Sequence, residues 1–260
     1  MPSVIAVPLS ALPEVRPGDD LAALIASAWL ELAEARPDLG PRAGDVLVVT
    51  QKVVSKAEGR LVDLSTVTPR PEAVAFAEDW QRDARQVEVV LRESAQVLRM
   101  ERGIIISRTR HGFVCANAGV DASNTGGGDL VTLLPDDPDE SATRLRARLP
   151  DLLGIDDGEA PAVVISDSFG RPWRLGIVDV ALGVAGLAPL VDLRGQPDTD
   201  GRTMHATVVA LADEIASAAE LAAGKTSRRP VVLVRGVEFV AGRGSVRRDV
   251  VMPAEMDLFR

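Results

Sequence analysis

Hydrophobic and polar positions repeat along the chain with two different periods, which predict both strands and helices. Short apolar runs rich in valine and isoleucine predict buried strands at 45–50, 162–166 and 231–234. An amphipathic pattern predicts a helix over 21–35 that stops before Pro37. Acidic residues at the start of 139–149 and arginines toward its end complement a helix dipole, so a second helix is expected there.

The remaining segments complete a mixed pattern. The charged, alanine-rich stretch 72–100 predicts one long helix or two short ones, and 104–107 with 112–116 predicts a pair of strands. A long helix is expected over 203–223, ending at Gly224 as a C-cap. Because these elements alternate irregularly, with hairpins as well as crossovers, they favour an α+β fold with mixed or antiparallel sheets and packed helices over a doubly wound sheet. With no low-complexity linker, residues 1–260 are expected to form one domain or two intimately packed parts.

Composition excludes several classes of protein. The 260 residues are 46% hydrophobic, enough for a sizeable core, and the net charge of −9 argues against a nucleic-acid partner. A single cysteine rules out an internal disulfide, and two histidines make a structural zinc site unexpected. The N-terminus has no signal-peptide pattern, and the apolar runs are far shorter than the roughly 20 residues of a membrane span. We therefore expect a cytoplasmic protein without a membrane partner.

Three polar segments follow predicted strands, where side chains are held rigidly and reach the surface. The first, 51–60, follows the strand at 45–50 and contains Lys52 and Lys56, which are suited to bind phosphate. The alternative interpretation is a solvated turn with two surface lysines.

The second segment, 115–124, leaves a strand and enters a glycine run. Asp121 and Asn124 are placed to face one ligand across a tight turn, although both residue types also form turns without any ligand. Cys115 lies inside a predicted strand with no histidine nearby in sequence, so we interpret it as a buried structural cysteine.

The third segment, 166–174, follows the strand at 162–166. Asp167 and Ser168 are hard oxygen ligands that suit magnesium or manganese, and Arg171 and Arg174 are spaced to clamp a phosphate or carboxylate. A helix N-cap is the alternative role for Asp167 or Ser168. Neither Asp121 nor Asp167 has a basic neighbour close enough in sequence to be its obvious partner.

The tripeptide Gly224-Lys225-Thr226 resembles the end of a phosphate-binding P-loop, but its context is wrong. The earlier glycine of that motif would fall at Ala219, inside a predicted helix, and the tripeptide follows a helix instead of a strand. Lys225 is therefore expected in a basic loop that can lie beside a nucleotide.

Five motifs, taken in order, carry a family resemblance. They are LPEVRPGDDL from Leu12, GDVLVVTQKVVSKAEGRLV from Gly44, ANAGVDASN from Ala116, VVISDSFGRPWRLG from Val163 and ADEIASAAELAAGK from Ala212. Together they cover essentially the whole chain, which resembles the coenzyme F420-0:L-glutamate ligase family, including the ligase domain of the actinobacterial two-domain enzymes.

The resemblance implies an activity and its requirements. Members join the amino group of L-glutamate to the lactate-derived carboxylate of the deazaflavin precursor F420-0, and further γ-linked glutamates can follow. They use GTP with a pair of manganese or magnesium ions, and a monovalent cation such as potassium assists. An F420 ligase-like fold and an intertwined homodimer are implied as well. The flavin-binding domain of the two-domain enzymes is not expected here, because the sequence stops at Arg260.

The resemblance also assigns roles to individual residues. The residues expected to contact the nucleotide are Leu12, Pro13, Glu14, Val15, Gln51, Lys56 and Asn124. Asp121, Asp167 and Ser168 are expected to hold the metals, with the two aspartates as the catalytic residues. Arg171, Arg174 and Lys225 are further candidates for phosphate or substrate. Members often carry threonine at the position of Ser168 and serine at that of Gln51. Glu58 is a candidate base for the glutamate amine.

Other functions fit the same residues. A metal-dependent phosphohydrolase would use the aspartates without glutamate, and a non-catalytic nucleotide-binding module would need only the lysines. A related ligase acting on a different carboxylate is the nearest alternative, because no spacing in the sequence reports a deazaflavin. Amide formation, bare phosphate release and binding without turnover distinguish these functions.

Overall fold

A six-stranded mixed sheet forms the centre of the molecule in the computed structural model, which describes residues 3–9, 12–123 and 128–258. The strand order is β1-β12-β2-β8-β9-β13. The strands are β1 (Ile5–Pro8), β2 (Val46–Thr50), β8 (Ala162–Arg171), β9 (Arg174–Leu187), β12 (Val231–Arg235) and β13 (Ala241–Gly242). Only the β2–β8 pair is parallel among these strands. The predicted α+β class with a mixed sheet is therefore confirmed.

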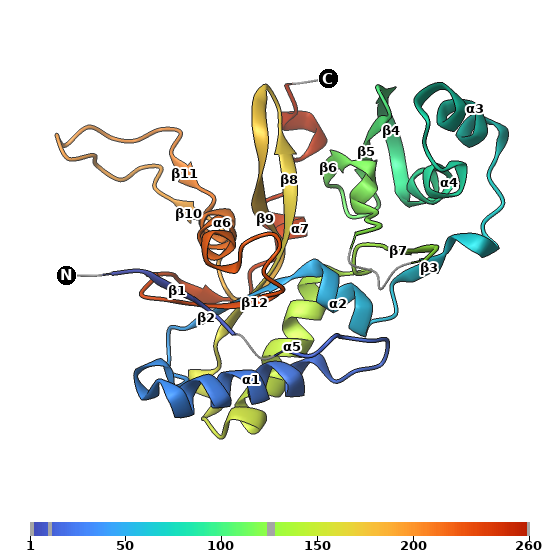
Figure 1. Ribbon diagram of the computed structural model, residues 1–260. Helices are drawn as coiled ribbons and strands as arrows, with labels where there is room; N and C mark the ends of the chain where they lie inside the picture. The colour runs from blue at the N-terminus through green and yellow to red at the C-terminus, as the bar shows by residue number, and fades with distance from the viewer. Residues whose placement is uncertain (1–2, 10–11, 124–127, 259–260) are drawn as a thin grey trace.

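Both faces of this sheet are covered, which explains the continuous apolar runs in its central strands. Helices α1 (Leu21–Ala35) and α5 (Pro138–Leu153) pack on one face, and α6 (Leu211–Ala223) packs on the other (Figure 1). Alternate residues of β8 enter different cores: Val163 and Ile165 face α1 and α5, whereas Ala162 and Val164 face α6. The predicted helices at 21–35 and 139–149 are confirmed, the second with longer bounds.

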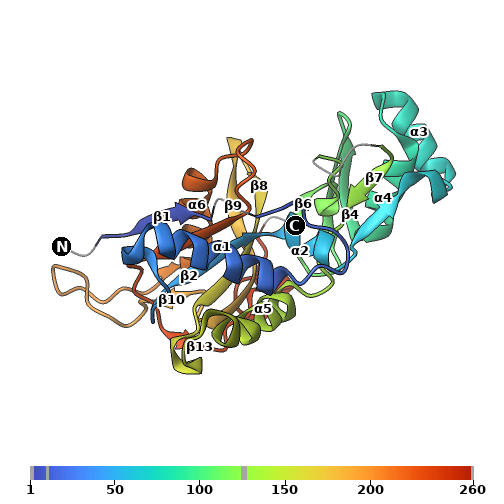
Figure 2. The same cartoon turned by 60° about the horizontal axis from the view of Figure 1, so that its bottom comes forward.

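A second group of elements lies at one end of the molecule, beyond α2 (Gln51–Ala57) (Figures 1 and 2). It contains β3 (Leu61–Asp63), α3 (Pro71–Trp80), α4 (Ala84–Glu93), β4 (Ser94–Glu101), β5 (Ile104–Thr109), β6 (Val114–Ala116) and β7 (Leu130–Thr132). Strands β4, β5 and β6 form a three-stranded sheet, and β3 pairs with β7. These elements share a hydrophobic core of their own.

The remaining elements are short. The remaining strands and α-helix are β10 (Val191–Asp192), β11 (Val208–Val209) and α7 (Val246–Asp249), and short 3-10 helices lie at Pro37–Leu39, Leu64–Thr66, Asn117–Gly119, Asp157–Glu159 and Ala254–Met256. Strands β10 and β11 form the base of a long arm that projects from the α6 side of the sheet (Figure 1). Within the described parts of the chain, every helix is too short or too polar to cross a lipid bilayer.

Two helix predictions were wrong at one end. The stretch 72–100 contains two short helices, but residues from Ser94 onward form β4, because pairing with β5 outweighs the helix propensity of this segment. The helix expected over 203–223 begins only at Leu211. The preceding residues return along the arm and pair Val208–Val209 with β10, an arrangement that suits β-branched side chains.

Candidate active site

Asp167 and Ser168 lie within a strand, not in a loop after it. Strand β8 continues to Arg171 and pairs with β9, which aligns Asp167 with Val180 and Ser168 with Asp179. Neither residue caps a helix, so that alternative was wrong. Because successive residues of a strand point to opposite faces, the two side chains project from opposite sides of the β8–β9 ribbon.

The Asp167 carboxyl group has an unusual protonation equilibrium. Its pKa is raised to about 7, chiefly by burial and also by the charges of Asp179 and Asp121, although the main-chain N–H of Ser168 and the charge of Lys225 act in the opposite direction. Cys115 lies close by in β6, where burial and the charge of Asp167 raise its pKa to about 12. The Cys115 thiol therefore stays neutral near pH 7, as expected for a structural cysteine.

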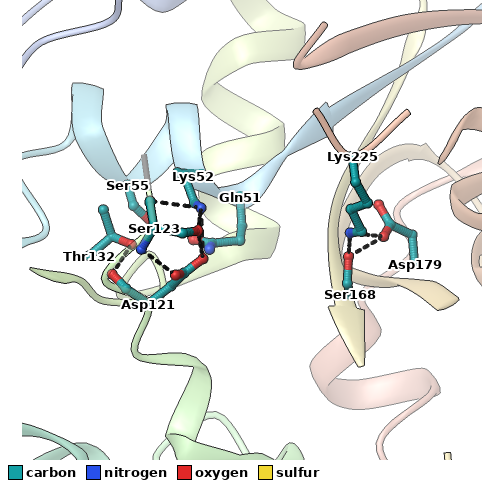
Figure 3. A network of polar contacts seen from close by, with 9 residues as sticks. All are labelled: Gln51, Lys52, Ser55, Asp121, Ser123, Thr132, Ser168, Asp179 and Lys225. Atoms are coloured by element: carbon teal, nitrogen blue, oxygen red, sulfur yellow. Dashed lines mark hydrogen bonds and ion pairs between the residues drawn. The ribbon is translucent and has the colours of Figure 1, made fainter. Parts of the chain in front are cut away.

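The Asp121 carboxylate is held in the opposite state. Its main chain pairs with Thr132, and its side chain accepts hydrogen bonds from the main-chain N–H and the hydroxyl of Ser123 at 2.6 and 2.9 Å. The Lys52 ammonium lies 2.6 Å from Oδ2 of Asp121, the same oxygen that accepts the hydrogen bond from the Ser123 hydroxyl (Figure 3). Burial alone would raise the pKa of Asp121, but the bonds from Lys52 and Ser123 outweigh burial and hold it below the ordinary value. Two neighbouring carboxyl groups thus have pKa values shifted in opposite directions, a pattern typical of functional sites.

Lys52 reaches Asp121 because the first polar segment is a helix. The segment predicted as a loop or solvated turn forms α2, directly after β2. Lys52 lies on its first turn, and its ammonium also binds the main-chain oxygen and hydroxyl of Ser123. The basic partner of Asp121 is therefore far away in sequence, and only the fold brings it close.

A second polar network lies on the other side of the ribbon (Figure 3). Asp179 is 5% exposed and accepts hydrogen bonds from the hydroxyls of Ser166 at 3.1 Å and Ser168 at 2.5 Å. The Lys225 ammonium binds the Ser168 hydroxyl and lies 3.3 Å from Asp179. Sequence reasoning missed Asp179, although a single aspartate inside the apolar run of β9 was a usable signal.

The residues expected at the nucleotide are only partly brought together. The Lys56 side chain is mostly buried and forms an ion pair with Glu14. Gln51 is 2% exposed and accepts a hydrogen bond from the Ser55 hydroxyl at 2.8 Å. Of the other members of this set, Val15 is buried, Leu12 packs against the main core, Pro13 is exposed, and Asn124 lies outside the described residues.

The weaker candidates lie apart from Asp121. Arg171 donates to the main-chain oxygen of Leu175 at 2.7 Å within the hairpin turn, and Arg174 is exposed on the same hairpin. Glu58 accepts hydrogen bonds from Ser141 and Arg144, both at 2.6 Å. It lines a hollow of about 390 Å³ between α1, α2 and α5, on a different face of α2 from Lys52. Glu58 is therefore already engaged away from the two catalytic candidates.

The residues fit a divalent cation on one side of the ribbon only. At Asp167, a poorly solvated carboxyl group lies near a second carboxylate, and a cation between them would offset their repulsion. Among the described residues, no three acidic, histidine or cysteine side chains lie close enough together to bind one metal ion. Further ligands of a cation at Asp121 and Asp167 would therefore come from the nucleotide, substrate or water. Ser168 does not fit in this arrangement, because Lys225 and Asp179 occupy its hydroxyl.

Comparisons with known proteins identify the family to which the chain is similar. A model of the family described as F420-0:Gamma-glutamyl ligase matches residues 10–236. The coenzyme F420:L-glutamate ligase of Methanothermobacter thermautotrophicus is 44% identical over 255 residues, which cover 96% of each chain. The enzyme of the same name from Methanopyrus kandleri is 44% identical over 265 residues, covering 100% of this chain and 99% of the relative. That of Halorubrum lacusprofundi is 46% identical over 241 residues, covering 90% and 88%.

Proposed function

This chain belongs to the F420-0:gamma-glutamyl ligase family, and from that premise we propose that it joins L-glutamate to coenzyme F420-0 through an amide bond. The observation that carries the proposal is the family match across residues 10–236, which includes both candidate catalytic aspartates. The relatives from Methanothermobacter thermautotrophicus and Methanopyrus kandleri are named as ligases of this type, and the similarity extends over 96% and 99% of their length. The reaction is therefore the formation of a carbon–nitrogen bond between a carboxylate and an amine.

Joining a carboxylate to an ammonium in water is uphill, so the carboxylate has to be activated. We propose that GTP supplies its γ-phosphoryl group, which moves onto the lactyl carboxylate of F420-0 and gives an acyl phosphate and GDP. The glutamate amine then attacks the acyl carbon, the C–O bond to phosphate breaks, and inorganic phosphate leaves. The same cycle on the new terminal glutamate would add further γ-linked residues.

Protein charges make the approach of two anions possible. Asp121 and Asp167 would hold a manganese or magnesium ion, which offsets the repulsion between phosphate and carboxylate when bound. Lys52 keeps Asp121 ionised by binding Oδ2, so a cation would bind through Oδ1, which accepts the main-chain N–H of Ser123 and has a further lone pair. Lys56 would provide a second positive charge for the phosphates, leaving Glu14 as the nucleotide enters. Potassium as an assisting ion and a homodimeric assembly belong to the same proposal.

The decisive experiment is mass spectrometry of F420-0 after incubation with the protein, L-glutamate, GTP and manganese. We expect a product heavier by one glutamyl residue, with GDP and phosphate formed in equal amounts. Asp121→Asn and Asp167→Asn should each lower turnover by about 100-fold or more, as the loss of an electrostatic element often does. Asp151→Asn is the matched control, because Asp151 is an exposed residue of α5.

Each alternative function gives a different outcome. Phosphate release without a glutamyl adduct would identify a phosphohydrolase, and GTP binding without turnover would identify a binding module. Glutamylation of another acid in preference to F420-0 would indicate a ligase for a different carboxylate. Near-normal turnover in either aspartate variant would show that the proposed mechanism is wrong at its centre.

A further inference from the structure

In the network around Asp179, the Lys225 ammonium lies where the family resemblance implies a divalent ion. Ser168 is the residue that the family resemblance assigns to a metal, yet its hydroxyl hydrogen donates to Asp179 and its oxygen accepts from the Lys225 ammonium. A hydroxyl that is engaged in this way cannot also bind a metal ion without Lys225 moving away. The structure thus disagrees with a second metal site at Ser168.

We propose that the Lys225 ammonium is the resident cation of the polar cluster formed by Ser166, Ser168 and Asp179, and that it excludes a divalent ion from this cluster. The proposal rests on the proposed function above, in which the other cation site lies between Asp121 and Asp167. It implies that this chain binds a divalent ion on one side of the β8–β9 ribbon and uses a tethered ammonium on the other.

The charges in the polar cluster favour this assignment. Asp179 is almost completely buried, and the two serine hydroxyls that bind it are neutral. Among the described residues, Lys225 is the one that forms an ion pair with this carboxylate. The Lys225 side chain itself remains 48% exposed. The ammonium therefore offsets the charge of Asp179 at the position where a divalent ion would have to bind Ser168 and Asp179.

The backbone holds Lys225 in this place. Helix α6 ends at Gly224, whose φ of 67° turns the chain sharply, and Lys225 follows directly. The Ser217 hydroxyl, on the same helix, donates to the main-chain oxygen of Asp179 at 2.8 Å. The helix that delivers the ammonium is therefore anchored to the strand residue that receives it, so the contact is built into the fold.

The test counts manganese ions bound per chain, by electron paramagnetic resonance titration of the full chain with GTP present. Replacing Lys225 with methionine removes the charge and keeps an unbranched side chain. We expect Lys225→Met to bind about one Mn²⁺ per chain more than the parent, because the vacated oxygens suit a hard cation. Lys225→Arg keeps a positive charge and should bind the same number as the parent.

A second change shows where the additional ion binds. Ser168→Ala in the Lys225→Met background should remove the additional ion. Ser227→Ala in the same background should not, because Ser227 lies in the same loop as Lys225 but outside the polar cluster. Equal manganese counts in Lys225→Met and the parent would overturn the proposal. The parent count itself tests the Asp121–Asp167 site, so failure of the proposed function and failure of this inference are distinguishable.

Discussion

The folded protein disfavours the charged form of the Asp167 carboxyl group, and this lowers the free energy of unfolding at neutral pH. Its pKa rises from an ordinary 3.8 to about 7, chiefly through burial and then through the charges of Asp179 and Asp121. Between these two values the folded chain keeps a proton that the unfolded chain releases. The free energy of unfolding therefore falls as the pH rises from about 4 to about 7, and this loss persists at higher pH.

Asp167→Asn removes this titration while keeping the shape of the side chain. Without divalent ions, we expect the variant to melt a few degrees above the parent at pH 8, and the difference to shrink to nearly zero by pH 4. Thermal denaturation followed by circular dichroism across this pH range measures the effect. Asp151→Asn should follow the parent at every pH, and a variant at Asp167 that also did so would contradict the raised pKa.

The two lysines of α2 allow a second prediction at the scale of single residues. Lys56→Ala should weaken GTP binding at least about tenfold, because a charged partner of phosphate is lost. Lys52→Ala should change GTP affinity little, since its ammonium is bound to Asp121 and Ser123. Isothermal titration with a non-hydrolysable GTP analogue at saturating manganese compares them. Equal losses of GTP affinity in both variants would show that the phosphate contact is wrongly assigned to Lys56.

The β8–β9 hairpin is the element that organises the candidate site. It carries Asp167 on one face and Ser168 with Asp179 on the other, and its paired backbone keeps the two polar networks a fixed distance apart. Helix α5 packs against this hairpin, and Asp139 in its first turn accepts a hydrogen bond from the main-chain N–H of Val184 at 2.9 Å. The position of the site therefore depends on how closely α5 approaches β9.

Gly183 makes that approach possible. A Cβ atom at this position would lie 2.2 Å from the main-chain carbon of Pro138 and 2.6 Å from the nitrogen of Asp139. Gly183→Ala must therefore push β9 and α5 apart, and we expect a loss of about 3 kcal/mol or more in the free energy of unfolding. Gly242→Ala is the control, because it lies in β13 with nothing within 4 Å of the added atom. Urea denaturation measures both, and similar stabilities would contradict this packing argument.

At the scale of the whole molecule, one projecting element carries exposed apolar side chains. The tip of the β8–β9 hairpin carries Leu175, which is 97% exposed, and Ile177, which is 56% exposed. Apolar side chains gathered on a projecting element commonly mark a contact surface. The tip of this hairpin is therefore the contact surface that we expect in the homodimer implied by the family resemblance.

We predict a dimer at micromolar concentration, with a mass of twice 27.5 kDa by light scattering. Leu175→Arg should shift the protein toward the monomer, because a charge would have to be buried in the contact. Leu221→Arg is the matched control, since Leu221 is 85% exposed on α6. A monomeric mass for the parent would show that the chain does not assemble as expected.

Local sequence patterns determined the main elements and the family of this protein. Apolar runs such as 45–50 and 231–234 can be predicted because a strand buried on both faces needs them, and the 3.6-residue period of α1 is equally local. The five ordered motifs were sufficient to indicate the ligase family, which the comparisons confirmed. The sequence also placed Asp121, Asp167 and Lys225 among the chemically interesting residues.

Only the tertiary structure decided how those residues combine. Lys52 and Ser123 are 71 positions apart, and Lys225 lies 57 positions from Ser168 and 46 from Asp179. Contacts over such separations follow from the order and register of strands, which no local pattern encodes. The boundary between Ser94 and the preceding helix was missed for the same reason, because β4 forms by pairing with β5. Element types follow from short-range periodicity, whereas the partner of each charge follows from how the sheet is assembled.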